Sequence, residues 1–171
     1  MTRIRPLGLL SAALLVSLVA AGCGSSGGTS SATVKAAGGS SATVSVANTG
    51  LGKILVDSKG DTLYLFAKDT GTKSTCFGGC ATAWPPLRAS GKPTAGGGAN
   101  ASLLGTTPRS DGKPQVTYKG HPLYGFQGDS KAGDTTGQGN TGFGAPWYVL
   151  SPAGNEITTT ASSGSGGVNG Y

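Results

Sequence analysis

A seven-residue phrase occurs twice in this chain, and the duplication constrains the fold more than any other feature. Residues 63–69 read Leu-Tyr-Leu-Phe-Ala-Lys-Asp, and residues 123–129 read Leu-Tyr-Gly-Phe-Gln-Gly-Asp. Each copy is followed by one of the two tryptophans, Trp84 or Trp147. A repeated phrase with a repeated large aromatic indicates two supersecondary units that share one packing arrangement.

The first residues predict an export signal. Residues 1–22 carry Arg3 and Arg5 near the start, and the apolar run at 7–21 is short for a membrane span. The ending Ala-Ala-Gly-Cys resembles a lipobox, in which the cysteine, here Cys23, is diacylated and becomes the first mature residue. Ala20 stands where leucine is usual, and the alternative is an ordinary signal peptide cleaved after residue 21 or 22.

Composition divides the rest of the chain. Residues 23–42 are rich in Ser and Gly and predict a flexible tether, and residues 158–171 predict a disordered tail. The remaining length is enough for one domain. It comprises residues 43–157, with copy one at about 43–90, a linker at 91–102 that is expected to be mobile, and copy two at about 103–157.

Short apolar runs between turn residues predict strands. In copy one, residues 43–46 alternate, and residues 53–57 and 62–67 form a hairpin around the turn at 58–61. Copy two repeats this pattern as a meander. Its expected strands are 106–109, 115–118 and 123–126, with Asp-Gly in the first turn and a further strand at 147–150.

We therefore predict an all-β fold in which two tandem meander or hairpin repeats pack as one small pseudo-two-fold domain. Two or three strands cannot hide their own apolar face, so each copy needs the other. The period of two places Tyr64 and Phe66 on one face of the strand and the two neighbouring leucines on the other. Phe66, Phe126, Trp84 and Trp147 are expected in the core. The alternative for these rings is an exposed ligand platform.

The aspartates that end the repeated phrase are predicted to hold the loops that follow. Asp69 and Asp129 each come shortly after a strand, where a short carboxylate accepts hydrogen bonds from loop amides. Cation binding is the alternative in copy two. Its loop offers oxygen ligands from Asp129, Asp134, Gln138 and Asn140, but lacks the terminal Glu of a calcium-binding loop.

A pair of cysteines remains if Cys23 carries the lipid. Cys76 and Cys80 flank Phe-Gly-Gly, and in an exported protein a disulfide is the default expectation. The CxxxC spacing is also similar to that of extracytoplasmic copper carriers, with His121 as a third ligand. That alternative lacks both the thioredoxin-like helical pattern and a methionine in the mature chain. We expect no cofactor.

Charge and residue inventory argue against two function classes. Loss of the two arginines of the signal leaves 11 basic and 7 acidic residues, about +4, and the lysines are scattered singly. A nucleic-acid face would need clustered basic residues, so no nucleic-acid partner is expected. With one histidine and no nucleophile elbow, metal triad or phosphate loop, we expect no enzyme.

The ordered motifs resemble a bacterial family of predicted lipoproteins with tandem secreted repeats of unknown function, marked by Tyr-x-(Phe/Trp/Tyr)-x-x-Asp. The match runs over about residues 53–157. The residues that carry it are Tyr64, Phe66, Asp69, Cys76, Cys80, Trp84-Pro85-Pro86-Leu87, Asp111-Gly112, Gln115-Val116-Thr117-Tyr118, Pro122-Leu123-Tyr124, Phe126, Asp129, Gly133-Asp134-Thr135, Gly137-Gln138-Gly139 and Trp147.

The resemblance implies an exported, lipid-anchored protein and implies no activity. The leading hypothesis is a noncatalytic lipoprotein on the outer face of the cytoplasmic membrane, a binding or structural module that contacts an envelope protein or a cell-wall polymer. The alternative is a redox or copper-handling accessory that uses Cys76 and Cys80. Local function is expected where the copies differ, in the 76–80 loop, at His121 and in the 129–140 loop.

Overall fold

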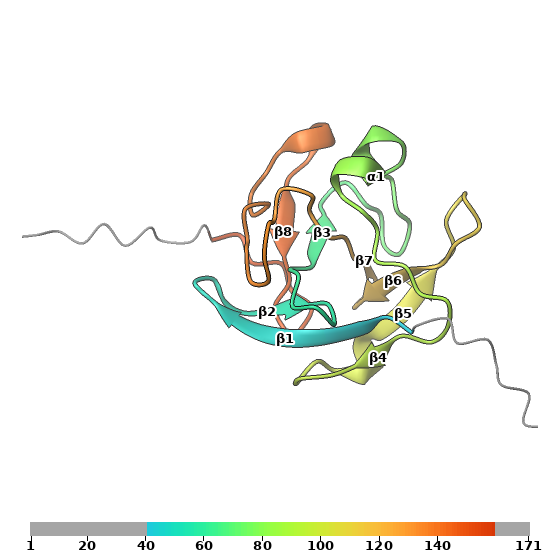
Figure 1. The fold of residues 1–171 in the computed structure, drawn as a ribbon. Coiled ribbons are helices and arrows are strands. Elements are labelled where there is room, and N and C mark those ends of the chain that lie inside the picture. Colours follow the sequence, from blue (N-terminus) through green and yellow to red (C-terminus); the bar gives the residue numbers. More distant parts are fainter. Residues whose placement is uncertain (1–40, 160–171) are drawn as a thin grey trace, which may run out of the picture. The chain divides into compact units, whose positions relative to one another are not determined.

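The computed structural model describes residues 41–159, and Figure 1 shows their arrangement. The predicted signal peptide, Cys23, nearly all of the predicted tether and most of the tail lie outside these residues. The elements in chain order are β1 (Thr43–Thr49), β2 (Gly52–Val56), β3 (Tyr64–Phe66), α1 (Gly79–Ala83), β4 (Thr94–Ala95), η1 (Ala101–Leu103), β5 (Leu104–Thr107), β6 (Gln115–Tyr118), β7 (His121–Pro122), η2 (Gly142–Gly144) and β8 (Trp147–Val149).

Copy one begins with the hairpin of β1 and β2, in which Ala47 faces Ile54. After β2 the chain turns through residues 57–61. Asp57 fixes this turn, because its Oδ1 accepts hydrogen bonds from the amides of Lys59 (2.8 Å) and Asp61 (3.0 Å). Thr62 then bridges back to Val56, which leads the chain into β3.

Copy two repeats this layout as the antiparallel sheet β5-β6-β7. The strand predicted at 106–109 lies two residues earlier, since Pro108 has no amide to continue the ladder. Lys119 and Gly120 join β6 to β7 with positive φ values of 50° and 84°. Two consecutive positive φ values give the tight hairpin turn that matches strand twist.

The segments that follow the tryptophans are exchanged between the copies. β8 of copy two pairs with β3 of copy one, and the two strands lie side by side in Figure 1. The segment after Trp84 lies in the same way against residues 123–127. Equivalent hydrogen bonds come in pairs: Tyr64 N to Tyr124 O (2.8 Å) with Tyr124 N to Tyr64 O (3.0 Å), Ala67 N to Pro146 O (3.0 Å) with Gln127 N to Ala83 O (3.0 Å), and Leu55 N to Leu150 O (3.0 Å) with Val116 N to Leu87 O (2.8 Å).

Aromatic rings meet on the pseudo-two-fold axis. Trp84 and Trp147 stack with centroids 4.0 Å apart and planes 3° apart. Phe66 stacks on Trp147 at 4.1 Å, and Phe126 stacks on Trp84 at 4.1 Å, so each tryptophan lies between its counterpart and a phenylalanine of the other copy. Both tryptophans and Phe66 are buried, whereas Phe126 is half-buried. These offset contacts contribute beyond the area that they bury.

The all-β, two-copy prediction is confirmed, and so are the two faces of the repeated phrase. Tyr64 and Phe66 belong to the aromatic cluster, and Leu63 and Leu65 belong to a second, aliphatic cluster. The linker predicted at 91–102 contains a short strand. Residues Thr94–Ala95 form β4, which adds in parallel to the start of β1, because the edge of β1 offers free amides and carbonyls.

Candidate functional site

The carboxylate of each aspartate in the repeated phrase accepts hydrogen bonds from three groups. Asp69 Oδ1 accepts hydrogen bonds from the amide (2.7 Å) and hydroxyl (2.9 Å) of Thr75, and its Oδ2 accepts one from the Tyr124 hydroxyl (2.6 Å). The sequence indicated the loop partner and gave no sign of the tyrosine. The carboxylate therefore fastens its own loop to the other copy.

Asp129 makes the same contacts on the opposite side of the axis. Its Oδ1 accepts hydrogen bonds from the amide (2.9 Å) and hydroxyl (2.6 Å) of Thr136, and its Oδ2 accepts one from the Tyr64 hydroxyl (2.8 Å). Each repeated phrase therefore donates its tyrosine hydroxyl to the aspartate of the other.

Both tyrosines remain protonated donors across the physiological pH range. Burial raises the pKa of Tyr64 well above its usual range, and the hydrogen bond to Asp129 raises that pKa further. Burial likewise raises the pKa of Tyr124, with Asp69 as the second cause. The Tyr–Asp pairs are thus suited to holding the copies together rather than to exchanging protons.

Cys76 and Cys80 are joined by a disulfide and are both buried. The loop that they close is fixed by Arg109, whose side chain is only 1% exposed. The Arg109 guanidinium donates to the carbonyl of Cys76 (2.7 Å) and to Oε1 of Gln115 (2.7 Å), and it lies 4.5 Å from the ring centroid of Phe77. No sequence signal separated Arg109 from the scattered surface cations.

His121 is half-buried in β7, opposite Tyr118. Within residues 41–159 no three His, Cys, Asp or Glu side chains gather as metal ligands, so His121 is not brought into such a group with the cysteines. The side-chain oxygens considered as cation ligands accept hydrogen bonds from backbone amides instead. Asp134 accepts from the amides of Ser130 and Lys131, and these bonds hold the pKa of its carboxyl below the usual range. Gln138 Oε1 accepts from Val149 N, and Asn140 Oδ1 accepts from Gly142 N.

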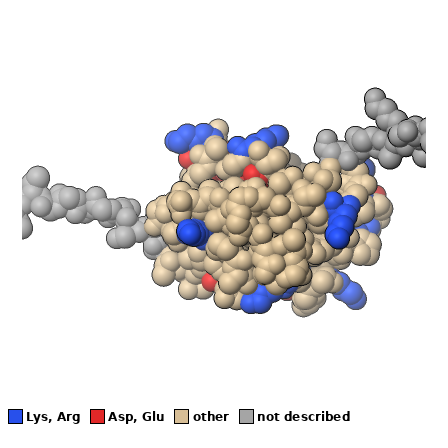
Figure 2. Space-filling model, turned by 90° about the horizontal axis from the view of Figure 1, so that it is seen from below, with Lys and Arg blue, Asp and Glu red and all other residues tan. Residues whose placement is uncertain are grey.

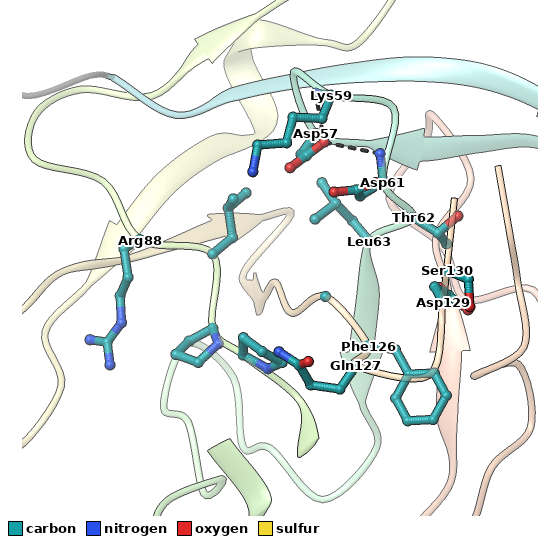
Figure 3. A pocket seen from close by; sticks show the side chains of 14 residues that line it. Asp57, Lys59, Asp61, Thr62, Leu63, Arg88, Phe126, Gln127, Asp129 and Ser130 are labelled. Carbon is teal, nitrogen blue, oxygen red and sulfur yellow. Dashed lines mark hydrogen bonds between the residues drawn. The ribbon is translucent and has the colours of Figure 1, made fainter. Parts of the chain in front are cut away.

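A groove of about 570 Å³ opens on one side of the pseudo-two-fold axis, and Figure 3 shows it from close by. Both copies contribute to it: the turn of copy one at 57–63, the exchanged segment at 85–88 and the residues at 125–130 that end the repeated phrase of copy two. Its volume falls in the range of small-molecule sites. The lining residues are Asp57, Lys59, Asp61, Thr62, Leu63, Pro85, Pro86, Leu87, Arg88, Gly125, Phe126, Gln127, Asp129 and Ser130.

The copies differ at a cross-strand pair that lines the groove. On the other side of the axis, Leu65 faces Tyr148, and both side chains belong to the aliphatic cluster. Their counterparts in the groove are Gly125 and Pro85, joined by the Gly125 amide to the Pro85 carbonyl (2.9 Å). A glycine and a proline leave open the volume that a leucine and a tyrosine fill. Of the loops predicted to carry function, only the start of 129–140 reaches this groove.

Several polar groups of the groove are already engaged. Asp57 binds the turn amides, and Asp129 binds Tyr64 and Thr136. Arg88 forms an ion pair with Asp111 and donates to the carbonyl of Lys113 (2.9 Å). Bonding to Arg88 holds the pKa of the Asp111 carboxyl well below its usual range. Arg88 thus belongs to the wall rather than to a ligand site.

The side chains of Lys59, Asp61 and Gln127 form no hydrogen bond with another residue of the described part of the chain. Figure 3 shows Lys59 and Asp61 on one rim of the groove, with Gln127 across from them. These groups face solvent with donors and acceptors to offer. The groove is thus lined by both polar and apolar groups, and its unengaged side chains include the ammonium of Lys59, the carboxylate of Asp61 and the amide of Gln127.

On the face of the described domain that Figure 2 shows, basic residues do not form one continuous patch. Figure 2 shows the domain from below, with Lys and Arg in several separate places on a largely neutral surface. Among the described residues, no helix has the length and apolar character needed to cross a membrane.

Fold and groove together define a small all-β domain made of two interlocked copies of one repeat. The family model described as a secreted repeat of unknown function matches residues 45–88 and 105–151, more than half of the chain, and the chain belongs to this family. The two matches begin and end at equivalent positions of the two copies, and they place the domain outside the cytoplasm. No curated protein and no solved structure matches the chain.

Proposed function

We propose that this protein is a noncatalytic binding module of the cell envelope, held at the outer face of the cytoplasmic membrane by a lipid on Cys23, and that the groove is its ligand site. One observation carries the proposal. The two copies keep the same core, yet they diverge at Gly125 and Pro85, and these two residues line the groove.

The chemistry of the groove supports binding rather than catalysis. Asp129 is saturated by hydrogen bonds from Tyr64 and Thr136, and Asp57 is occupied by its own turn. Among the lining groups there is no His, Cys or Tyr, and two of the three carboxylates are engaged in structural hydrogen bonds. General acid–base and nucleophilic catalysis both rely on side chains of these types.

The redox alternative depends on accessible thiols. Cys76 is fully buried, and the disulfide loop is held by Arg109, which supports a structural role for the pair. Thiol titration of the native protein tests this. Under mild reductant we expect the pair to remain oxidised and no copper to copurify; facile reduction or bound copper would favour the alternative.

Lipid anchoring is supported by the Ala-Ala-Gly-Cys sequence that ends at Cys23. Mass spectrometry of the membrane-associated protein is expected to find diacylglycerol on Cys23. A Cys23→Ser chain is expected in the soluble fraction. Recovery of unmodified protein that begins elsewhere would refute the anchor without affecting the groove.

A filling substitution tests the groove. Gly125→Leu restores the residue found at position 65, and a Cβ at Gly125 meets no atom within 4 Å. The matched control is Gly50→Leu, since Gly50 lies outside the groove and its Cβ is equally unhindered. In sedimentation with isolated envelope material, we expect Gly125→Leu to lose binding and Gly50→Leu to retain it. Equal binding by both would remove the groove from the function.

A further inference from the structure

We propose that the groove takes a neutral glycan, such as a segment of N-acetylated sugar polymer, rather than a protein segment or a polyanion; this inference rests on the proposed binding function and narrows its ligand.

Three backbone amides that line the groove are already paired. The amides of Leu63, Leu87 and Gly125 donate to Leu55 O (3.0 Å), Leu123 O (2.9 Å) and Pro85 O (2.9 Å). Pro85 and Pro86 have no amide to donate. An extended peptide binds a sheet by adding a strand to a free edge. At these five positions no amide is free to pair with a peptide, which favours a ligand that is recognised through side chains.

The charge of the groove disfavours phosphate- or carboxylate-rich polymers. Three carboxylates line it, from Asp57, Asp61 and Asp129. Two cations line it as well, but Arg88 is neutralised by Asp111, which leaves Lys59 alone. The remaining field is acidic, and like charges repel an anionic chain.

The shape and chemistry of the groove suit a sugar ring. Such a ring has flat C–H faces and a rim of hydroxyl and acetamido groups. Pro85, Pro86 and Leu87 are half-buried and supply apolar surface, and Gly125 lets the ring approach the backbone closely. Asp61 can accept hydroxyl hydrogen bonds, and Gln127 can both donate and accept across the groove. Polar groups beside these apolar patches match the mixed surface of a sugar ring.

Calorimetric titration of the full mature chain carrying Cys23→Ser tests the inference. The probes are a β-linked N-acetylglucosamine oligosaccharide, a linear polyphosphate and a proline-rich peptide. We expect the oligosaccharide alone to bind. Gly125→Leu and Gln127→Ala should each weaken this binding at least about tenfold, whereas Gly50→Leu should not change it.

Every other pattern overturns the inference. Binding of the peptide or polyphosphate in place of the sugar would show the wrong ligand class, and so would the absence of binding to all three probes. Sugar binding that survives Gly125→Leu would locate it elsewhere. If Gly125→Leu still abolishes binding to envelope material in those cases, the proposed function stands and only the glycan assignment fails.

Discussion

The two sides of the pseudo-two-fold axis share a core and differ at the surface. On one side Leu65 and Tyr148 fill the cross-strand position, and on the other side Gly125 and Pro85 leave a groove. At the axis, by contrast, the tryptophan stack and the crossed Tyr–Asp bonds are the same in both directions. The two copies therefore share one scaffold, and their divergence at the surface accompanies the groove that we propose as the ligand site.

The loops that precede the tryptophans offer a second contrast. In copy one, Cys76 and Cys80 close the loop with a disulfide. In copy two, Gly137 follows the threonine that binds the aspartate, as Cys76 does in copy one, and a Cβ there would come within 2.7 Å of Trp84. Copy two thus packs backbone against the stack where copy one uses a covalent link.

The largest expected effect tests the equality of the two tryptophans. Trp84→Ala and Trp147→Ala should each lower the free energy of unfolding by about 3–5 kcal/mol, because each removes a buried ring from one stack. Urea denaturation measures both. If one variant loses stability within this range and the other loses far more or far less, the two copies do not contribute equally to the core.

Removal of the disulfide should cost less. Replacing Cys76 and Cys80 together with alanine should lower the free energy of unfolding by about 2 kcal/mol, since the closed loop is short. Thermal denaturation with and without reductant gives the value. In the double variant, reductant should have no effect; a residual shift would require another reducible group.

The crossed Tyr–Asp bonds predict a dependence on alkaline pH. Because folding raises the pKa of Tyr64 and Tyr124, their contribution is complete below the unfolded value of about 10 and is lost as the pH rises above it. Tyr64→Phe should cost about 1–2 kcal/mol at neutral pH and weaken this alkaline loss.

Denaturation midpoints measured from neutral to alkaline pH check this, with Tyr148→Phe as the control. Tyr148 is half-buried and lies away from both aspartates in the pairing scheme. An alkaline loss of equal size in the Tyr64→Phe and control chains would contradict the assignment.

The smallest effect on stability belongs to the groove. Gly125→Leu should change the free energy of unfolding by no more than about 0.5 kcal/mol, because the added side chain enters open space at an ordinary φ. A large loss of stability would mean that the groove is a packing requirement rather than a site.

Local sequence signals predicted the antiparallel pair of β5 and β6. The hairpin expected between 53–57 and 62–67 forms only an isolated bridge between Val56 and Thr62, since β2 pairs with β1 and β3 pairs with β8. Alternation placed Tyr64 and Phe66 on the correct face, and Gly and Asp marked the turns. The exchange of segments after Trp84 and Trp147 was not predictable, because strand pairing between copies leaves no local pattern. Arg109 was missed for the same reason, since its partners lie far from it in the sequence.

The groove was visible in the sequence in principle. Alignment of the two phrases makes Gly125 the sequence equivalent of Leu65. The meaning of this difference depends on knowing that residue 65 faces Tyr148 in the sheet. Attention to the cysteines, the histidine and the acidic loop followed residue chemistry. The groove instead lies where Gly125 and Pro85 stand in place of a leucine and a tyrosine. The sequence alone does not show which of such replacements leave open space.

The pairing of β3 with β8 also sets when this secreted chain can finish folding. Trp147–Val149 come late in the sequence, yet they supply the neighbouring strand of Tyr64–Phe66. During export from the amino end, the first half emerges without its partner and has to wait, with its aromatic face uncovered, until the last strand has crossed. The pairing of β3 with β8 can therefore form only after Trp147–Val149 are available, and we expect a chain truncated before Trp147 to lack both this pairing and the tryptophan stack.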